Sequence, residues 1–186
     1  ALLNVSLKNN ASSYIGIKNS FQKASSNSDS DILHALWYDT THTVENFITP
    51  KNIEQLDKAI TLMMEASRIN LLGLRSSRTV SLYLESAIDR FYPHVRQLSN
   101  ESEFLYDKIF RLSAEEDIII IFSAWPCTKR TIDVSAICRD RHVPIILVTN
   151  TSLNPIARYA DIVIDTNSVN SGCGILPLMF IAEALT

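Results

Sequence analysis

The chain has 186 residues, of which 46% are hydrophobic and 20% charged, as is ordinary for a globular protein with one main domain. Its formal net charge of −3 argues against a broad nucleic-acid-binding surface. The three cysteines lack CxxC spacing and predict neither a disulfide framework nor a zinc site, and no apolar run is long enough to span a bilayer. We therefore expect a cytoplasmic protein with no metal, cofactor or membrane attachment.

The N-terminal stretch differs from the rest of the chain. Residues 24–31 are polar and of low complexity, which is typical of a linker. Residues 1–31 are therefore interpreted as a linker or the remnant of an N-terminal region, and residues 32–186 as one domain. Ser30 or Asp31 is predicted to cap a helix that Pro50 ends. The apolar stripe of this helix consists of Leu33, Leu36, Trp37, Val44, Phe47 and Ile48.

A second helix is predicted next, with Met63 and Met64 packed in the core from its apolar face. From residue 69 the pattern changes to short β-rich runs that alternate with helical stripes. The third run is continuously apolar from Ile118 to Phe122, as expected for a strand that is covered on both faces. The five runs cover residues 69–74, 94–98, 117–123, 143–149 and 161–165.

This alternation predicts an α/β three-layer sandwich, in which helices cover both faces of a five-stranded parallel sheet. We expect the flavodoxin-like strand order 2-1-3-4-5, with an N-terminal helical extension before the first strand. In such sheets, ligands bind outside the carboxyl ends of the strands, where the strand order switches. The functional site is therefore predicted near residues 73–78 and 123–131.

Both of these loops are rich in hydroxyl and cationic side chains, and each precedes a predicted helix. Free amides and the dipole at a helix N-terminus favour an anion, and hydroxyls and guanidiniums add donors suited to phosphate. Either loop alone is equally well explained by a serine or threonine that caps the helix, beside solvated cations. Two such loops at one crevice favour an anion site. The residues are Gly73, Arg75, Ser76, Ser77 and Arg78 in the first loop, and Ser123, Thr128, Lys129, Arg130 and Thr131 in the second.

Residues 32–186 resemble the sugar isomerase (SIS) family. The first loop is similar to the Gly-x-Gly-x-Ser element of that family, with Gly73 on the first glycine and Ser77 on the serine. Arg75 stands where the family usually has its second glycine. The second loop is similar to the family's hydroxyl-rich loop that ends in a threonine. The resemblance implies a phosphosugar held by Gly73, Arg75, Ser76, Ser77, Ser123, Thr128, Lys129 and Thr131.

Within the SIS family, the sequence is most similar to the sensor half of RpiR-type bacterial transcription regulators, in which two helices precede the first strand. This resemblance implies a phosphosugar-binding sensor and dimerisation domain that forms a homodimer or a higher homo-oligomer. DNA contact is expected only through a helix-turn-helix that is not present in this sequence. The run from Thr149 to Asp161 also resembles the family, and Asn154 is predicted to cap a short helix that begins with Pro155.

Two other functions remain open from the sequence. An aldose–ketose isomerase needs a base beside the sugar carbonyl. His94 begins one predicted strand and His142 precedes another, so both lie at the end of the sheet away from the site. Two of the glutamates suit the start of a helix, so no catalytic residue is predicted. A SIS module that has lost its ligand and only dimerises is the other alternative, because Arg75 replaces a glycine. The candidate bases are His94, His142, Glu101, Glu103 and Glu183.

Overall fold

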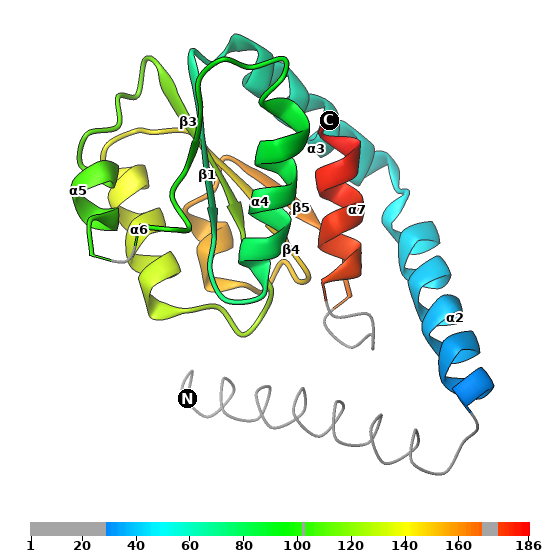
Figure 1. The fold of residues 1–186 in the computed structure, drawn as a ribbon. Helices are drawn as coiled ribbons and strands as arrows, with labels where there is room; N and C mark the ends of the chain where they lie inside the picture. The colour runs from blue at the N-terminus through cyan, green and yellow to red at the C-terminus, as the bar shows by residue number, and fades with distance from the viewer. Residues whose placement is uncertain (1–28, 102, 169–174) are drawn as a thin grey trace.

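The computed structural model describes residues 29–101, 103–168 and 175–186 (Figure 1). Within these ranges, five parallel strands form one sheet in the order β2-β1-β3-β4-β5, which confirms the predicted topology. Each strand overlaps one of the predicted apolar runs. The strands are β1 (Arg68–Gly73), β2 (Val95–Gln97), β3 (Asp117–Phe122), β4 (Ile145–Thr149) and β5 (Ile162–Asp165).

Helices cover both faces of the sheet, so the fold is the predicted three-layer α/β sandwich. The helices α3 (Pro50–Glu65), α4 (Ser77–Ile88) and α7 (Leu176–Ala184) pack on one face. The other face is covered by α5 (Leu105–Ile109), α6 (Lys129–Asp140) and the 3-10 helix η1 (Pro155–Arg158). Helix α2 (Asp29–Phe47) contacts α7 and extends past it, away from the sheet (Figure 1). None of the helices described has the length and apolar character needed to cross a membrane.

Strand β3 shows why a continuous apolar run fits the centre of this sheet. Ile118, Ile120 and Phe122 pack into the core beneath α3, α4 and α7. Ile119 and Ile121 point to the opposite face and pack beneath α5 and α6. Because side chains alternate between the two faces and both faces are covered, every residue of β3 is buried.

The helices before the sheet differ from the sequence-based expectation at both of their boundaries. Ser30 and Asp31 lie within α2, so neither residue caps its start. Pro50 is the first residue of α3, where its fixed φ angle suits a helix start, and does not itself end the preceding helix. Thr49 caps α3, because its hydroxyl accepts a hydrogen bond from the Asn52 amide at 3.2 Å.

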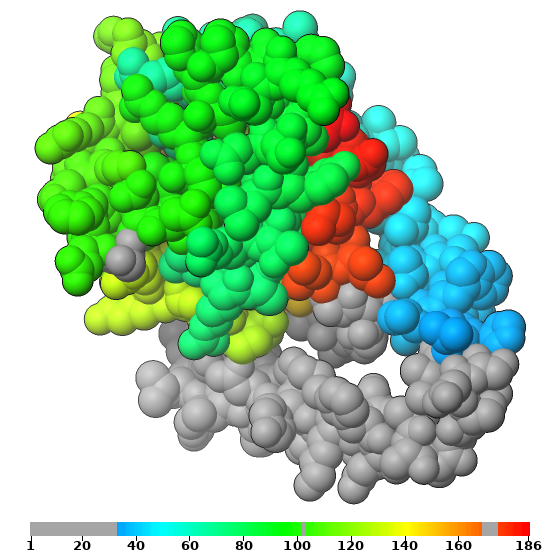
Figure 2. All heavy atoms as spheres, viewed as in Figure 1, coloured from blue at the N-terminus to red at the C-terminus, as the bar shows by residue number. Residues whose placement is uncertain are grey.

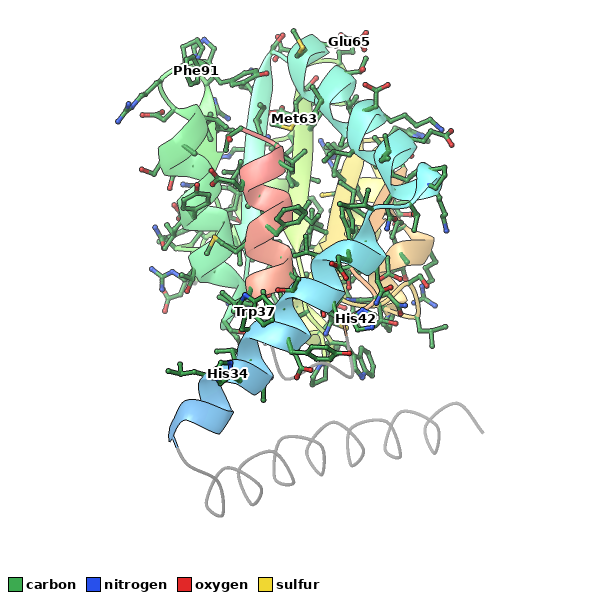
Figure 3. The ribbon with its side chains drawn as sticks, turned by 90° about the vertical axis from the view of Figure 1, so that its right-hand side faces the viewer. His34, Trp37, His42, Met63, Glu65 and Phe91 are labelled. Atoms are coloured by element: carbon green, nitrogen blue, oxygen red, sulfur yellow. The ribbon has the colours of Figure 1, made fainter. Side chains whose placement is uncertain are left out.

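The apolar stripes of these helices are only partly buried. Met63 is buried and Met64 is 71% exposed, so the prediction that both methionines pack in the core is wrong for Met64. On α2, Phe47 is buried against Phe180 of α7, whereas Trp37 is 68% exposed (Figure 3). Hydrophobic spacing identifies one face of a helix, but the described chain covers only the part of that face that reaches the core.

A buried carboxylate ties together the amino ends of β1 and β3. The Arg68 guanidinium donates to both oxygens of Asp117 at 2.8 and 2.7 Å, and the Ser113 amide and Asn70 also donate to this carboxylate. Burial alone would raise the pKa of Asp117, but these hydrogen bonds outweigh it and lower the pKa to about 2. This ion pair therefore stabilises the edge of the sheet opposite to the predicted site.

Candidate functional site

A hollow lies at the carboxyl edge of the sheet, between the loop after β1 and the loop after β3. These two strands are neighbours at the point where the strand order switches, which is where the sequence predicts the site. Six of the eight predicted site residues line the hollow, and the other two, Gly73 and Lys129, are each adjacent in sequence to a lining residue. The lining residues are Leu74, Arg75, Ser76, Ser77, Phe122, Ser123, Ala124, Pro126, Cys127, Thr128 and Thr131.

Gly73 allows α4 to begin directly against the end of β1. A Cβ atom at this position would lie 2.2 Å from the Ser77 carbonyl oxygen, far inside contact distance. The Gly73 amide donates to the Ser99 hydroxyl at 2.7 Å, and Ser99 in turn bonds the Ser81 hydroxyl of α4 at 2.9 Å. In the structure Gly73 therefore allows α4 to pack closely on β1, and its amide, which donates to Ser99, is engaged within the protein.

The two serines of the first loop have different roles. Ser76 occupies the N-cap position of α4, but its hydroxyl makes no capping bond. The hydroxyl of Ser77, which is 3% exposed, accepts a hydrogen bond from the Ala124 amide at 3.3 Å and so joins the two loops. Among the described residues, none accepts a hydrogen bond from the amides of Ser76 or Ser77. The start of α4 therefore presents backbone donors to the hollow.

Arg75 keeps the backbone conformation that a glycine would adopt most easily. Its φ angle is 56°, in the left-handed region that costs a residue with a Cβ atom about 1 kcal/mol or more. The side chain is exposed and lines the hollow. The loop therefore retains its glycine-like path and gains a guanidinium beside the hydroxyls.

Two threonines shape the second loop at the start of α6. The Thr128 hydroxyl caps the helix by accepting the Thr131 amide at 3.2 Å, as the sequence allows. The Thr128 and Thr131 hydroxyl oxygens are 2.8 Å apart, so one of their two protons lies between them. The pair can therefore donate one hydrogen bond, not two, to a ligand in the hollow.

Two asparagines after β4 hold the second loop in place, and no local pattern predicted this role. The Asn150 side-chain oxygen accepts the Trp125 amide at 2.7 Å. The Asn154 side chain donates to the Ser123 carbonyl at 3.0 Å, and it also caps η1 as predicted, through the Ile156 amide. Both side chains are buried. The only sequence signal was a cluster of polar residues at the end of an apolar strand. That these residues contact the loop around residue 125 can be predicted only once the strand order is known.

The lining of the hollow suits binding better than proton abstraction. Among the described residues that line it, Cys127 is the only titratable group besides Arg75. Burial raises the pKa of the Cys127 thiol, which keeps it neutral and a poor base near neutral pH. His94 and His142 precede β2 and β4, at the opposite edge of the sheet. The described part of the chain also contains no cluster of three or more side chains that could hold a metal ion.

This arrangement defines a class of protein: a doubly wound α/β domain with a hollow between two hydroxyl-bearing helix N-termini, a geometry that suits a small anion. Residues 62–183 match the model of the SIS domain family. This match spans more than half of the chain, and the protein belongs to the SIS domain family.

The chain is also similar to a curated transcription regulator and to solved structures. An uncharacterized HTH-type transcriptional regulator of Thermotoga maritima is 20% identical over 153 residues, which cover 80% of this chain and 52% of the regulator. The chain thus spans about half the length of that curated relative. The sugar isomerase domain of the RpiR transcription factor from Sphaerobacter thermophilus has a TM-score of 0.71 at 21% identity, over 84% of this chain and 86% of that chain. The Vibrio vulnificus NanR protein complexed with ManNAc-6P has a TM-score of 0.72 at 15% identity, over 83% and 61% of the chains.

Proposed function

We propose that this chain is the phosphosugar-binding sensor and dimerisation domain of an RpiR-type transcription regulator. The observation that carries the proposal is the hollow between α4 and α6, where buried hydroxyls and the amides of two helix N-termini converge. The similarity to a regulator from Thermotoga maritima and to the RpiR and NanR structures supports the regulatory part. The ManNAc-6P in the NanR complex supports a phosphosugar as the class of ligand.

The phosphate group of the sugar is the anchor in this proposal. Ser77, Ser123 and the Thr128–Thr131 pair donate hydroxyl hydrogen bonds, and the first-turn amides of α4 and α6 add backbone donors. Arg75 supplies positive charge from the rim of the hollow, and Lys129 supplies it from the start of α6. Hydrogen bonds to a charged group contribute roughly 1.5–3 kcal/mol each, so a few of them suffice for micromolar affinity.

A route for the signal follows from the helix contacts. A phosphate held by both loops favours one placement of α4 relative to α6, since Ser77 already bonds the second loop. Helix α4 packs against α7, and α7 contacts α2, which leads toward the N-terminus. A ligand that binds one placement of α4 more tightly than another therefore shifts the position of α2 and of any DNA-binding domain attached to it.

Dimerisation is proposed through the exposed face of α2. The N-terminal part of this helix projects from the body of the molecule (Figure 2), and its apolar side chains Leu33, Trp37 and Tyr38 are 68%, 68% and 60% exposed. Monomeric proteins rarely leave a contiguous apolar patch of this kind uncovered. Sedimentation velocity at micromolar concentration is expected to show a dimer, and Trp37→Glu is expected to shift it toward monomer. Met64→Glu, which changes an exposed apolar residue on α3, is the matched control.

A thermal-shift screen against hexose, pentose and amino-sugar phosphates tests the binding function. At least one phosphosugar is expected to raise the melting temperature, while the matching unphosphorylated sugar leaves it unchanged, because a ligand that binds only the native state stabilises it. Incubation of any hit with the protein, followed by analysis of the sugar, then separates a sensor from an isomerase. Turnover of the hit would replace the sensor with an enzyme, and the absence of any shift across the panel would favour a module kept only for dimerisation.

A further inference from the structure

One side-chain amide joins the end of α2 to the carboxyl edge of the sheet. The Asn52 side chain, in the first turn of α3, donates to the Phe47 carbonyl at 2.9 Å and to the Asp165 carbonyl at 3.3 Å. Phe47 is the last residue of α2, and Asp165 is the last residue of β5. Because both partners are carbonyl oxygens, both N–H donors of the asparagine side chain are used. Asn52 therefore holds together two segments that are far apart in the sequence.

The end of β5 is in turn bonded to the second loop of the hollow. Directly after β5, the Thr166 amide donates to the Thr149 carbonyl at 2.9 Å. The Ser168 amide donates to the Asn150 carbonyl at 3.0 Å. The Asn150 side chain accepts the amide of Trp125, which lies between two lining residues of the hollow, at 2.7 Å. A series of hydrogen bonds therefore leads from the second loop to the end of α2 without passing through α4 or α7.

Helix α3 is held against the sheet by contacts that do not involve Asn52. Ala59 and Met63 are buried in the core beneath this helix. The Gln55 side chain accepts the Val163 amide of β5 at 3.4 Å. A change at Asn52 is therefore expected to leave α3 in place and to release only the contact between the ends of α2 and β5.

We infer that the Asn52 link transmits ligand binding in the hollow to α2. This inference rests on the proposed function and names a second connection beside the one through α4 and α7. A phosphate held by the second loop favours one position of that loop, and Asn150 relates this position to the Asp165 carbonyl to which Asn52 donates. The Phe47 carbonyl, the other acceptor of Asn52, then sets the angle at which α2 leaves the domain.

The length of α2 makes a small change at this angle visible. Residues 33–39 are all exposed, so the helix is anchored mainly near its C-terminal end. The helix has 19 residues and is therefore about 28 Å long, so a rotation of about 5° at Phe47 displaces its far end by about 2.5 Å. A displacement of this size is large enough to reposition any domain attached to the N-terminal end of α2.

Asn52→Asp tests this role, because a carboxylate has nearly the same shape but cannot donate to either carbonyl. The helix dipole favours an acidic group in the first turn of α3, so the helix should remain folded. Asn52→Ala, which removes both donors without adding charge, is expected to give the same result. Asn46→Asp is the matched control, since the Asn46 side chain bonds His42 within α2 at 2.7 Å.

Amide NMR spectra and calorimetry supply the two measurements, with glucose 6-phosphate, N-acetylglucosamine 6-phosphate and ribose 5-phosphate as ligands. A ligand that binds is expected to shift the amide signals of residues 33–47 in the wild-type protein and in Asn46→Asp. In Asn52→Asp its affinity should stay within about twofold, because among the described residues Asn52 shares no hydrogen-bond partner with those that line the hollow. The shifts of residues 33–47 at saturation should fall by about half or more.

The two measurements separate this inference from the proposed function. Signals of α2 that move as far in Asn52→Asp as in the wild-type protein would overturn the inference and leave phosphosugar binding in place. The same holds if a bound ligand moves no signal of α2 in the wild-type protein. Loss of binding in Asn52→Asp would make Asn52 a support of the site and would also overturn its role in transmission. Failure of all three ligands to bind the wild-type protein would count against both proposals.

Discussion

Replacing Gly73 with alanine tests whether close packing of α4 on β1 holds the site in place, because the added methyl group would overlap the first turn of α4. The new Cβ atom would lie 2.2 Å from the Ser77 carbonyl oxygen and 2.7 Å from the Ser77 carbonyl carbon. Since both atoms belong to the backbone, no side-chain rotation relieves the overlap, and the start of α4 must move by roughly 1 Å to reach an ordinary contact distance. The Ser77 hydroxyl moves with it and loses its bond from Ala124.

The expected cost follows from two opposing effects. Overpacking of this kind costs about 1–3 kcal/mol, and the lower chain entropy of alanine in the unfolded state returns about 0.4–1 kcal/mol. The free energy of unfolding should therefore fall by about 1–2 kcal/mol in urea titrations, which corresponds to a decrease in melting temperature of roughly 2–8 °C for a domain of this size. Phosphosugar binding should fall more than tenfold, because the hydroxyl and amides of the first turn leave their positions.

Ser76→Ala is the matched control for Gly73→Ala. Ser76 lies in the same turn, but it is exposed and its hydroxyl makes no capping bond, so its loss should change stability by less than about 0.5 kcal/mol. If Gly73→Ala is as stable as the wild-type protein and binds phosphosugar equally well, the close packing of α4 on β1 is not what holds the site in place.

Three further predictions concern single side chains. Ser77→Ala and Thr131→Ala should each weaken phosphosugar binding by roughly 1–2 kcal/mol in calorimetry, and equal affinity in both variants would contradict their assignment to the phosphate. Arg75→Gly should raise the free energy of unfolding by about 0–1.5 kcal/mol, because relief of about 1–2 kcal/mol of left-handed strain is partly offset by about 0.4–1 kcal/mol of chain entropy that glycine gains in the unfolded state. It should also weaken phosphosugar binding by loss of the guanidinium, and an Arg75→Gly protein less stable than wild type by more than about 0.5 kcal/mol would refute the strain. Asp117 should make the protein acid-sensitive, because its pKa is lowered from 3.8 to about 2 in the folded state. Its contribution of about 2 kcal/mol to the free energy of unfolding is complete above pH 5 and is lost as the pH falls from about 4 to 2. Asp117→Asn, compared by urea titration across this pH range, should remove that part of the acid dependence and should destabilise the protein at pH 7 by leaving Arg68 without its buried partner.

The sheet and the place of the site followed from local patterns in the sequence. A continuous run such as Ile118 to Phe122 fits only a strand with both faces covered, and the alternation of such runs with helical stripes leaves few topologies. The two hydroxyl-rich loops could then be placed on one edge of the sheet, because the carboxyl ends of parallel strands share an edge. The structure confirms both the strand order and the hollow between these loops.

The features that the sequence did not predict depend on contacts between distant segments. Asn150 holds the amide of Trp125, and Ser99 holds that of Gly73, across separations of 25 and 26 residues. No local pattern marks these bonds, since a buried polar residue after a strand is equally compatible with a turn. The exposed stripe of α2 has a similar cause: spacing showed which face of the helix is apolar, but what covers that face depends on neighbours beyond the helix itself.

The central claim is that a phosphosugar binds between the N-termini of α4 and α6, and amide NMR spectra recorded during a titration test it most directly. A phosphosugar identified by thermal shift should move the backbone amide signals of Ser76, Ser77, Lys129 and Arg130 far more than those of α3 or β5, and the unphosphorylated sugar should move none of them. Saturable shifts confined to another part of the chain, or no shifts at any phosphosugar concentration, would contradict the account.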